Sequence, residues 1–253
     1  MLRKRNTNSP HCTICTTGGK DMSSFMEERR EQRMASTDYS EELDARTYNI
    51  ALGAVVLYGL VLNVIMVAAL GDRMRYVNPI ALIIGYIVSC IVGTLMSSKS
   101  DNPVISFIGY NLIVVPIGLV LSLTVEPLIR YGNGDIVKQA IVYTAVSAAV
   151  MIGLSIAFPD TFSKLGGILF GALIGLLIAG VISIFFFPGL QEPLAWVGAA
   201  IFALYIGYDY WRAQQYPKTL DNAVDSAVDI YLDIINLFLR ILRILSGGKS
   251  RRS

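Results

Sequence analysis

The sequence predicts an all-α integral membrane protein with seven transmembrane helices. Hydrophobic residues make up 54% of the 253 residues and charged residues only 16%, against about 25% charged residues in an average soluble domain. The mean hydropathy is +0.55. The apolar runs show no alternation of the kind found in membrane β-barrels, so helices are expected to satisfy the backbone in lipid.

Seven apolar stretches follow one another, each near the ~20 residues that span the hydrocarbon core. They cover residues 49–70, 79–97, 104–125, 136–158, 165–187, 193–211 and 223–245. The connecting segments are short and polar or contain Pro and Gly, for example "SSKSDN", "PDTFSK" and "PGLQE". None of them is long enough to fold independently. We therefore expect one transmembrane domain, residues 47–246, in which the helices pack on one another.

Both ends of the chain are polar. Residues 1–46 carry eight Lys or Arg and no apolar signal-peptide core, which predicts a disordered basic N-terminal tail. Met34 is a second candidate start, and residues 247–253 form a short basic C-terminal tail. In "HCTIC", the side chains of His11, Cys12 and Cys15 could bind metal, but a closed zinc site needs four ligands. We expect no structural metal and no cofactor.

Three of the spans contain residues that suggest packing roles. Gly167, Gly171 and Gly175 recur every four residues in the fifth span, and such a stripe allows close approach of another helix. Pro116 in the third span and Asn63 in the first predict a kink and an interhelical hydrogen bond. We assign none of them to a functional site.

The last span, "LDNAVDSAVDIYLDIINLFLRILRIL", carries polar residues along one face. They are Asp225, Asp229, Asp233, Asn236, Arg240 and Arg243; the eighteen residues from first to last make about five helical turns. Asp221 is predicted to cap the helix and Asp225 to face headgroups or water from its first turn. Asp229 and Asp233 lie deeper, where an ionisable residue is a functional candidate.

A second intramembrane acid, Asp209, ends the sixth span in "ALYIGYDYWRAQQYP". The connection to the last helix is short, so Asp209 is expected beside Asp229 or Asp233. Two close, poorly solvated carboxylates tend to share one proton. Fully deprotonated, they repel each other and can bind a divalent cation through oxygen. The alternative to a proton-sharing pair is that one of these aspartates forms a structural ion pair with a basic residue such as Lys99 or Arg212.

The segments "IYLDIINLFLRILRIL" and "LYIGYDYWRAQ" resemble the last two helices of the Bax inhibitor-1 family, and "AIVYTAVSAAV" in the fourth span resembles another family segment. The resemblance covers residues 45–246. It implies two three-helix layers around a central C-terminal helix and a pH-sensitive calcium leak. The family's aspartate pair falls on Asp209 and Asp233 as gate and proton sensor. The family's basic residue in the second span has only Lys99 as an approximate substitute here.

We therefore expect a pH-gated calcium leak channel and no enzymatic activity, with Asp229 as an accessory ion ligand. Its partners are calcium ions, protons and the lipid bilayer, and a net charge of +2 without a basic run in the body of the chain does not suggest nucleic acid. With the N-terminus inside, twelve Lys or Arg lie on the inner side and nine on the outer. This balance, with the resemblance, predicts a bacterial plasma membrane protein with a cytoplasmic N-terminus.

Two other classes are weighed against the channel. A proton-coupled ion or solute transporter would also suit a buried acid pair, although no inverted repeat is detected in the sequence. Intramembrane aspartyl proteases share a Gly-x-Gly-Asp motif, whereas Asp233 follows Ile230, Tyr231 and Leu232. Serine and metal hydrolase schemes need a histidine near the site, and the one histidine, His11, lies in the tail.

Overall fold

The computed structural model describes residues 31, 33, 34, 42–71, 73, 77–99 and 102–250. In these residues all regular secondary structure is helical, and no strand is present, which confirms the all-α prediction. The long helices are α2 (Ala45–Leu70), α3 (Pro79–Lys99), α4 (Pro103–Arg130), α5 (Gly134–Ala157), α7 (Gly166–Phe185), α8 (Gln191–Ala213) and α9 (Leu220–Ser250). Two short helices, α6 (Pro159–Ser163) and η3 (Pro188–Leu190), lie in connecting segments.

Five of the described helices are long and apolar enough to cross a membrane: α2, α4, α5, α7 and the continuous segment Pro188–Ala213. A shorter apolar segment, Ile84–Ser97, lies within α3. By length and composition the described chain is therefore a multi-pass membrane protein. Helix α3 is not among the five because the side chains of Ile83 and Ser98, which flank Ile84–Ser97, lie outside the description, and α9 is not among them because it carries four aspartates.

The ends of two helices follow from their capping residues. Asp44 precedes α2, and its carboxylate accepts hydrogen bonds from the N–H groups of Arg46 and Thr47, which satisfies donors that have no partner within the helix. Asn102 caps α4 in the same way. Pro116 lies inside α4 without ending it.

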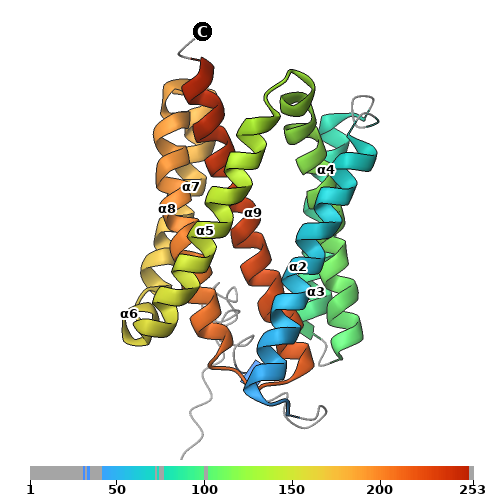
Figure 1. Cartoon of the computed structure of the whole chain (residues 1–253), viewed down its shortest axis with the longest axis vertical. Coiled ribbons are helices and arrows are strands. Elements are labelled where there is room, and N and C mark those ends of the chain that lie inside the picture. Colours follow the sequence, from blue (N-terminus) through green and yellow to red (C-terminus); the bar gives the residue numbers. More distant parts are fainter. Residues whose placement is uncertain are drawn as a thin grey trace, which may run out of the picture.

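Helix α9 passes between one group of helices, α2, α3 and α4, and a second group, α5, α7 and α8 (Figure 1). It packs against α2, α4, α5 and α8, while α3 packs on α4 and α7 packs on α8. Tyr110 of α4 and Tyr231 of α9 are fully buried at the centre of the largest core cluster, with their rings edge to face at 5.5 Å. The acidic helix is therefore shielded on several sides by other helices.

The closest helix approach supported by glycines is that of α3 and α4. A Cβ built on Gly93 would lie 2.6 Å from the Gly109 carbonyl oxygen, so neither position accepts a larger residue without movement of the backbone. By contrast, a Cβ at Gly167, Gly171 or Gly175 would meet no atom within 4 Å. The prediction that this stripe packs against another helix is therefore wrong in the part of the chain described.

Candidate functional site

The site centres on Asp209 of α8 and Asp233 of α9, each only 7% exposed. The two helices are antiparallel neighbours joined by residues 214–219, which places the end of α8 beside the first turns of α9. The two carboxyl groups lie within hydrogen-bonding distance of each other. A hydrogen bond between two carboxyl groups needs one proton, because carboxylates have no donor. The two acids that the sequence predicted to lie side by side are therefore neighbours in the structure.

Each acid of this pair also has a buried oxygen that accepts no hydrogen bond. These atoms are Asp209 Oδ1 and Asp233 Oδ2. Unpartnered buried oxygens are uncommon in folded proteins and call for an explanation by function or by an unseen ion or water. A proton shared between the two carboxyl groups is one such explanation, since neither ionised carboxylate has a donor of its own.

Arg212, in the last turn of α8, contacts an aspartate of its own helix and an aspartate of α9. Its Nη2 donates a hydrogen bond to Asp229 Oδ2 at 2.8 Å and lies 3.0 Å from Asp209 Oδ1. The second contact is an ion pair without a hydrogen bond, since Asp209 Oδ1 accepts none. The acid pair and the structural basic partner, treated above as alternatives, therefore occur together around Asp209.

A second arginine reaches Asp229 from the segment before α2. Arg33 Nη1 lies 3.5 Å from Asp229 Oδ2, and Arg33 is 8% exposed. It falls within the stretch predicted to be a disordered tail, where it is one of eight basic residues. No pattern in the sequence distinguishes Arg33 from the other seven, so sequence reasoning missed it.

The sequence analysis predicted that Asp221 caps the last helix and that Asp225 faces headgroups or water, but α9 already begins at Leu220 and both carboxylates lie inside the bundle. Each is 3% exposed. Ser106 of α4 donates a hydrogen bond to Asp221 Oδ1 at 2.7 Å, and Ser97 of α3 donates one to Asp225 Oδ1. The prediction is wrong because α3 and α4 cover the first turns of α9 and supply hydroxyl donors there.

The remaining candidate residues from the sequence have side chains outside the described part of the chain. Lys99 is the last residue of α3, and its side chain lies outside the description. His11, Cys12 and Cys15 also lie outside the described residues. Within the described part, no three His, Cys, Asp or Glu side chains gather to hold a metal ion.

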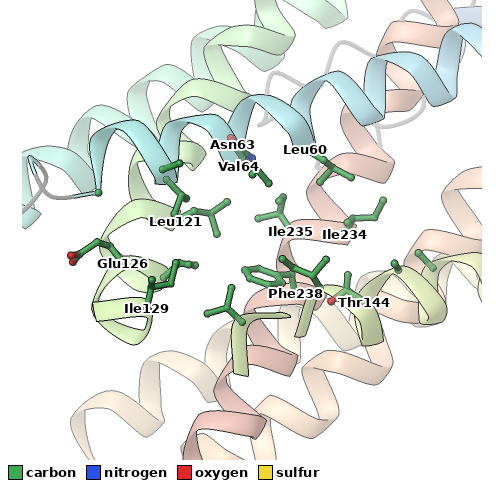
Figure 2. A pocket seen from close by; sticks show the side chains of 18 of the residues that line it. Leu60, Asn63, Val64, Leu121, Glu126, Ile129, Thr144, Ile234, Ile235 and Phe238 are labelled. Atoms are coloured by element: carbon green, nitrogen blue, oxygen red, sulfur yellow. The ribbon is translucent and has the colours of Figure 1, made fainter. Parts of the chain in front are cut away.

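An apolar cavity of about 690 Å³ lies between α2, α4, α5 and α9. Figure 2 shows Ile234, Ile235 and Phe238 of α9 at one wall, with Leu60 and Leu121 among the residues contributed by α2 and α4. The lining includes none of the aspartates of α8 and α9. Because Ile234 and Ile235 follow Asp233 directly, the cavity begins where the acidic part of α9 ends.

Asn63 of α2 connects the lining of this cavity with the core. Its Nδ2 donates a hydrogen bond to the Tyr231 hydroxyl at 2.5 Å, and the side chain is 3% exposed. The interhelical hydrogen bond predicted for Asn63 is therefore confirmed. It ties α2 to α9 two residues before Asp233.

The family model described as "Inhibitor of apoptosis-promoting Bax1" matches residues 41–251. A protein of Helicobacter pylori is 33% identical over 159 residues, which are 60% of this chain and 65% of the relative. Mouse Protein lifeguard 4 is 34% identical over 130 residues (50% of this chain, 53% of the relative), and the Golgi anti-apoptotic protein of vaccinia virus is 31% identical over 131 residues (51% and 55%). The matched part thus spans less than two thirds of each relative's length. With its acidic last helix and the match over most of its length, the chain belongs to the Bax inhibitor family.

Proposed function

We propose that the protein is a passive, pH-sensitive calcium leak channel whose gate and proton sensor are Asp209 and Asp233. One observation carries the proposal: the two carboxyl groups meet between adjacent helices, both 93% buried, with an oxygen on each left without a hydrogen bond. Acids in such a setting inside a membrane protein commonly mark a proton or ion pathway. The site thus combines a proton-dependent contact with oxygen ligands suited to calcium.

In the closed state one proton is shared and a hydrogen bond holds α8 against α9. Loss of that proton leaves two carboxylates whose repulsion is about 4 kcal/mol at 4 Å for an effective dielectric constant of 20. This energy exceeds that of an ordinary hydrogen bond, about 1 kcal/mol. The pair then separates or binds a divalent cation, and either change alters the contact between the two helices.

The path proposed for the ion has two chemically different parts. Asp229 and Asp233 lie about 6 Å apart along α9 at 1.5 Å per residue, and they provide oxygen ligands. Beyond Asp233 lies the cavity between α2, α4, α5 and α9, whose mainly apolar walls offer an ion little solvation. Asp229 serves as an accessory ligand once its arginines move away.

The proposed topology follows from this path. All seven long helices cross the membrane, with the α2, α3 and α4 group and the α5, α7 and α8 group as two layers around α9 (Figure 1). The charge balance of the loops and tails supports a proposed N-terminus in the cytoplasm of a bacterial cell. Acidic residues in α9 are tolerated because they face other helices rather than lipid.

The full chain reconstituted into vesicles that contain a calcium dye tests the proposal. Asp209→Asn and Asp233→Asn should flatten the dependence of calcium entry on pH, because neither variant can form or break a proton-shared pair. The matched control is Asp221→Asn, which keeps an oxygen to accept the hydrogen bond of Ser106 and should preserve the pH dependence. Equal responses of the three variants would refute the role of the pair, and calcium transport driven uphill by a proton gradient would identify a transporter instead.

A further inference from the structure

Arg33 is held firmly at the end of the bundle where α9 begins. Its Nη2 donates to Ser226 Oγ at 2.6 Å and to the Asn222 carbonyl oxygen at 3.2 Å, and its Nε donates to Asn222 Oδ1 at 3.2 Å. The guanidinium also lies 3.9 Å from the centroid of the Tyr216 ring. In return, Asn222 Nδ2 donates to the carbonyl oxygen of Arg33 at 3.1 Å. Both the main chain and the side chain of Arg33 are therefore fixed on the first turns of α9.

The α9 residues that bind Arg33 lie on the same face of this helix as Asp233, the member of the acid pair that α9 contributes. Asn222, Ser226, Asp229 and Asp233 are spaced by four, three and four residues, which places them on one side of the helix. Arg33 covers the first two turns of this face and ends at Asp229. Along this face, counted from the end of the bundle where α9 begins, Arg33 therefore comes before Asp233.

Within the group formed by the three carboxyl groups of the site and the two arginines, the charges are balanced only when Arg33 is present; Asp225, which also lies near Arg33 but is hydrogen-bonded to Ser97, is left outside this count. Arg33 and Arg212 offset two of the three carboxylates of Asp209, Asp229 and Asp233. A proton shared by the acid pair offsets the third. Without Arg33 the same group of side chains would carry one net negative charge, and a buried oxygen-lined site with net negative charge attracts a divalent cation.

We propose that Arg33 is a tethered cation that occupies the entrance to the acid pair and competes with calcium for Asp229. When Arg33 leaves, Asp229 loses one of its two arginine contacts and the face of α9 that starts at Asn222 becomes accessible. This inference rests on the proposed calcium leak and adds to it a regulatory role for the side chain of Arg33. The guanidinium acts as a reversible plug rather than as an ion ligand.

Calcium entry into vesicles containing the full chain tests the plug. Arg33→Ala should raise calcium entry roughly tenfold at neutral pH, the change expected when one charge-assisted hydrogen bond is lost. Arg33→Lys should give an intermediate rate, because lysine keeps the charge but not the planar fork of donors. Ser226→Ala, a smaller change, should also raise entry. The control is Arg46→Ala, which removes an exposed positive charge near the start of α2 and should leave the rate unchanged.

A second measurement separates the contact from its regulatory role. In detergent, Arg33→Ala and Ser226→Ala should lower the melting temperature by less together than the sum of their separate effects, because they remove the same hydrogen bond. If this coupling is found while calcium entry is the same in wild type and all Arg33 variants, the contact is only structural and the plug is refuted. If even the wild-type protein passes no calcium, the proposed leak itself is refuted and the plug with it.

Discussion

Replacement of Arg212 by glutamine tests how the acid site is held together. The substitution removes the charge that lies 2.8 Å from Asp229 Oδ2 and 3.0 Å from Asp209 Oδ1. The side chains of Arg212, Asp229 and Asp209 are 23%, 21% and 7% exposed. Loss of one partner of a buried ion pair costs about 3–5 kcal/mol, and partial exposure favours the lower end of that range.

A loss of about 3 kcal/mol corresponds to a fall in melting temperature of about 6–12 °C for a chain of this size. The assay is thermal unfolding of the detergent-solubilised protein followed by tryptophan fluorescence. Adding Asp229→Asn to Arg212→Gln should restore part of the loss, because it removes a carboxylate left without this partner. Arg243→Gln is the control, since Arg243 is exposed and surface substitutions usually change stability by no more than about 0.5 kcal/mol.

The reasoning would be refuted if Arg212→Gln unfolded at the wild-type temperature. It would also be refuted if the losses of Arg212→Gln and Asp229→Asn simply added. Additivity would mean that the two side chains do not interact energetically, whatever their distance.

Further substitutions test the packing and the pH response, each by thermal unfolding in detergent. Asn63→Leu should cost about 1–3 kcal/mol because it leaves the buried Tyr231 hydroxyl without its partner, and adding Tyr231→Phe should recover most of the loss. Gly109→Ala should cost about 1–3 kcal/mol through overpacking against α3, whereas Gly171→Ala, with open space around its Cβ, should cost nothing. Hydrogen bonds from the Thr47 hydroxyl and from the N–H groups of Thr47 and Arg46 lower the pKa of Asp44 below 3.8. The stabilisation by Asp44 is therefore present above pH 3.8 and is lost as the pH falls through the lowered value. Asp44→Asn should remove this acid-dependent loss of stability, and an unchanged acid response would contradict the assignment.

The helices were largely predictable because their length and apolar content are fixed by the bilayer. The predicted second and fifth spans, 79–97 and 165–187, differ from α3 and α7 by no more than two residues at either end. The third span was predicted to end at residue 125, yet α4 continues to Arg130. Glu126 and Arg130 form an ion pair one turn apart, so polar residues extend this helix beyond its apolar part.

The acid site was predictable only in part. The short connection between the last two helices placed Asp209 near Asp233, because antiparallel neighbours must bring those ends together. The partners of Asp221 and Asp225 were not predictable, since they are serines of α3 and α4 more than a hundred residues away. Arg33 was missed for the same reason, as its contacts depend on tertiary structure rather than on local pattern.

The cavity bounded by α2, α4, α5 and α9 also affects how the bundle can move. Around this cavity α4 and α5 still pack on each other, and α9, which packs against helices of both groups, provides the rest of the connection between them (Figure 1). Two bodies joined through a shared element can rotate about it while few contacts are broken. Helix α9 would then act as the hinge axis of the bundle as well as its most acidic member.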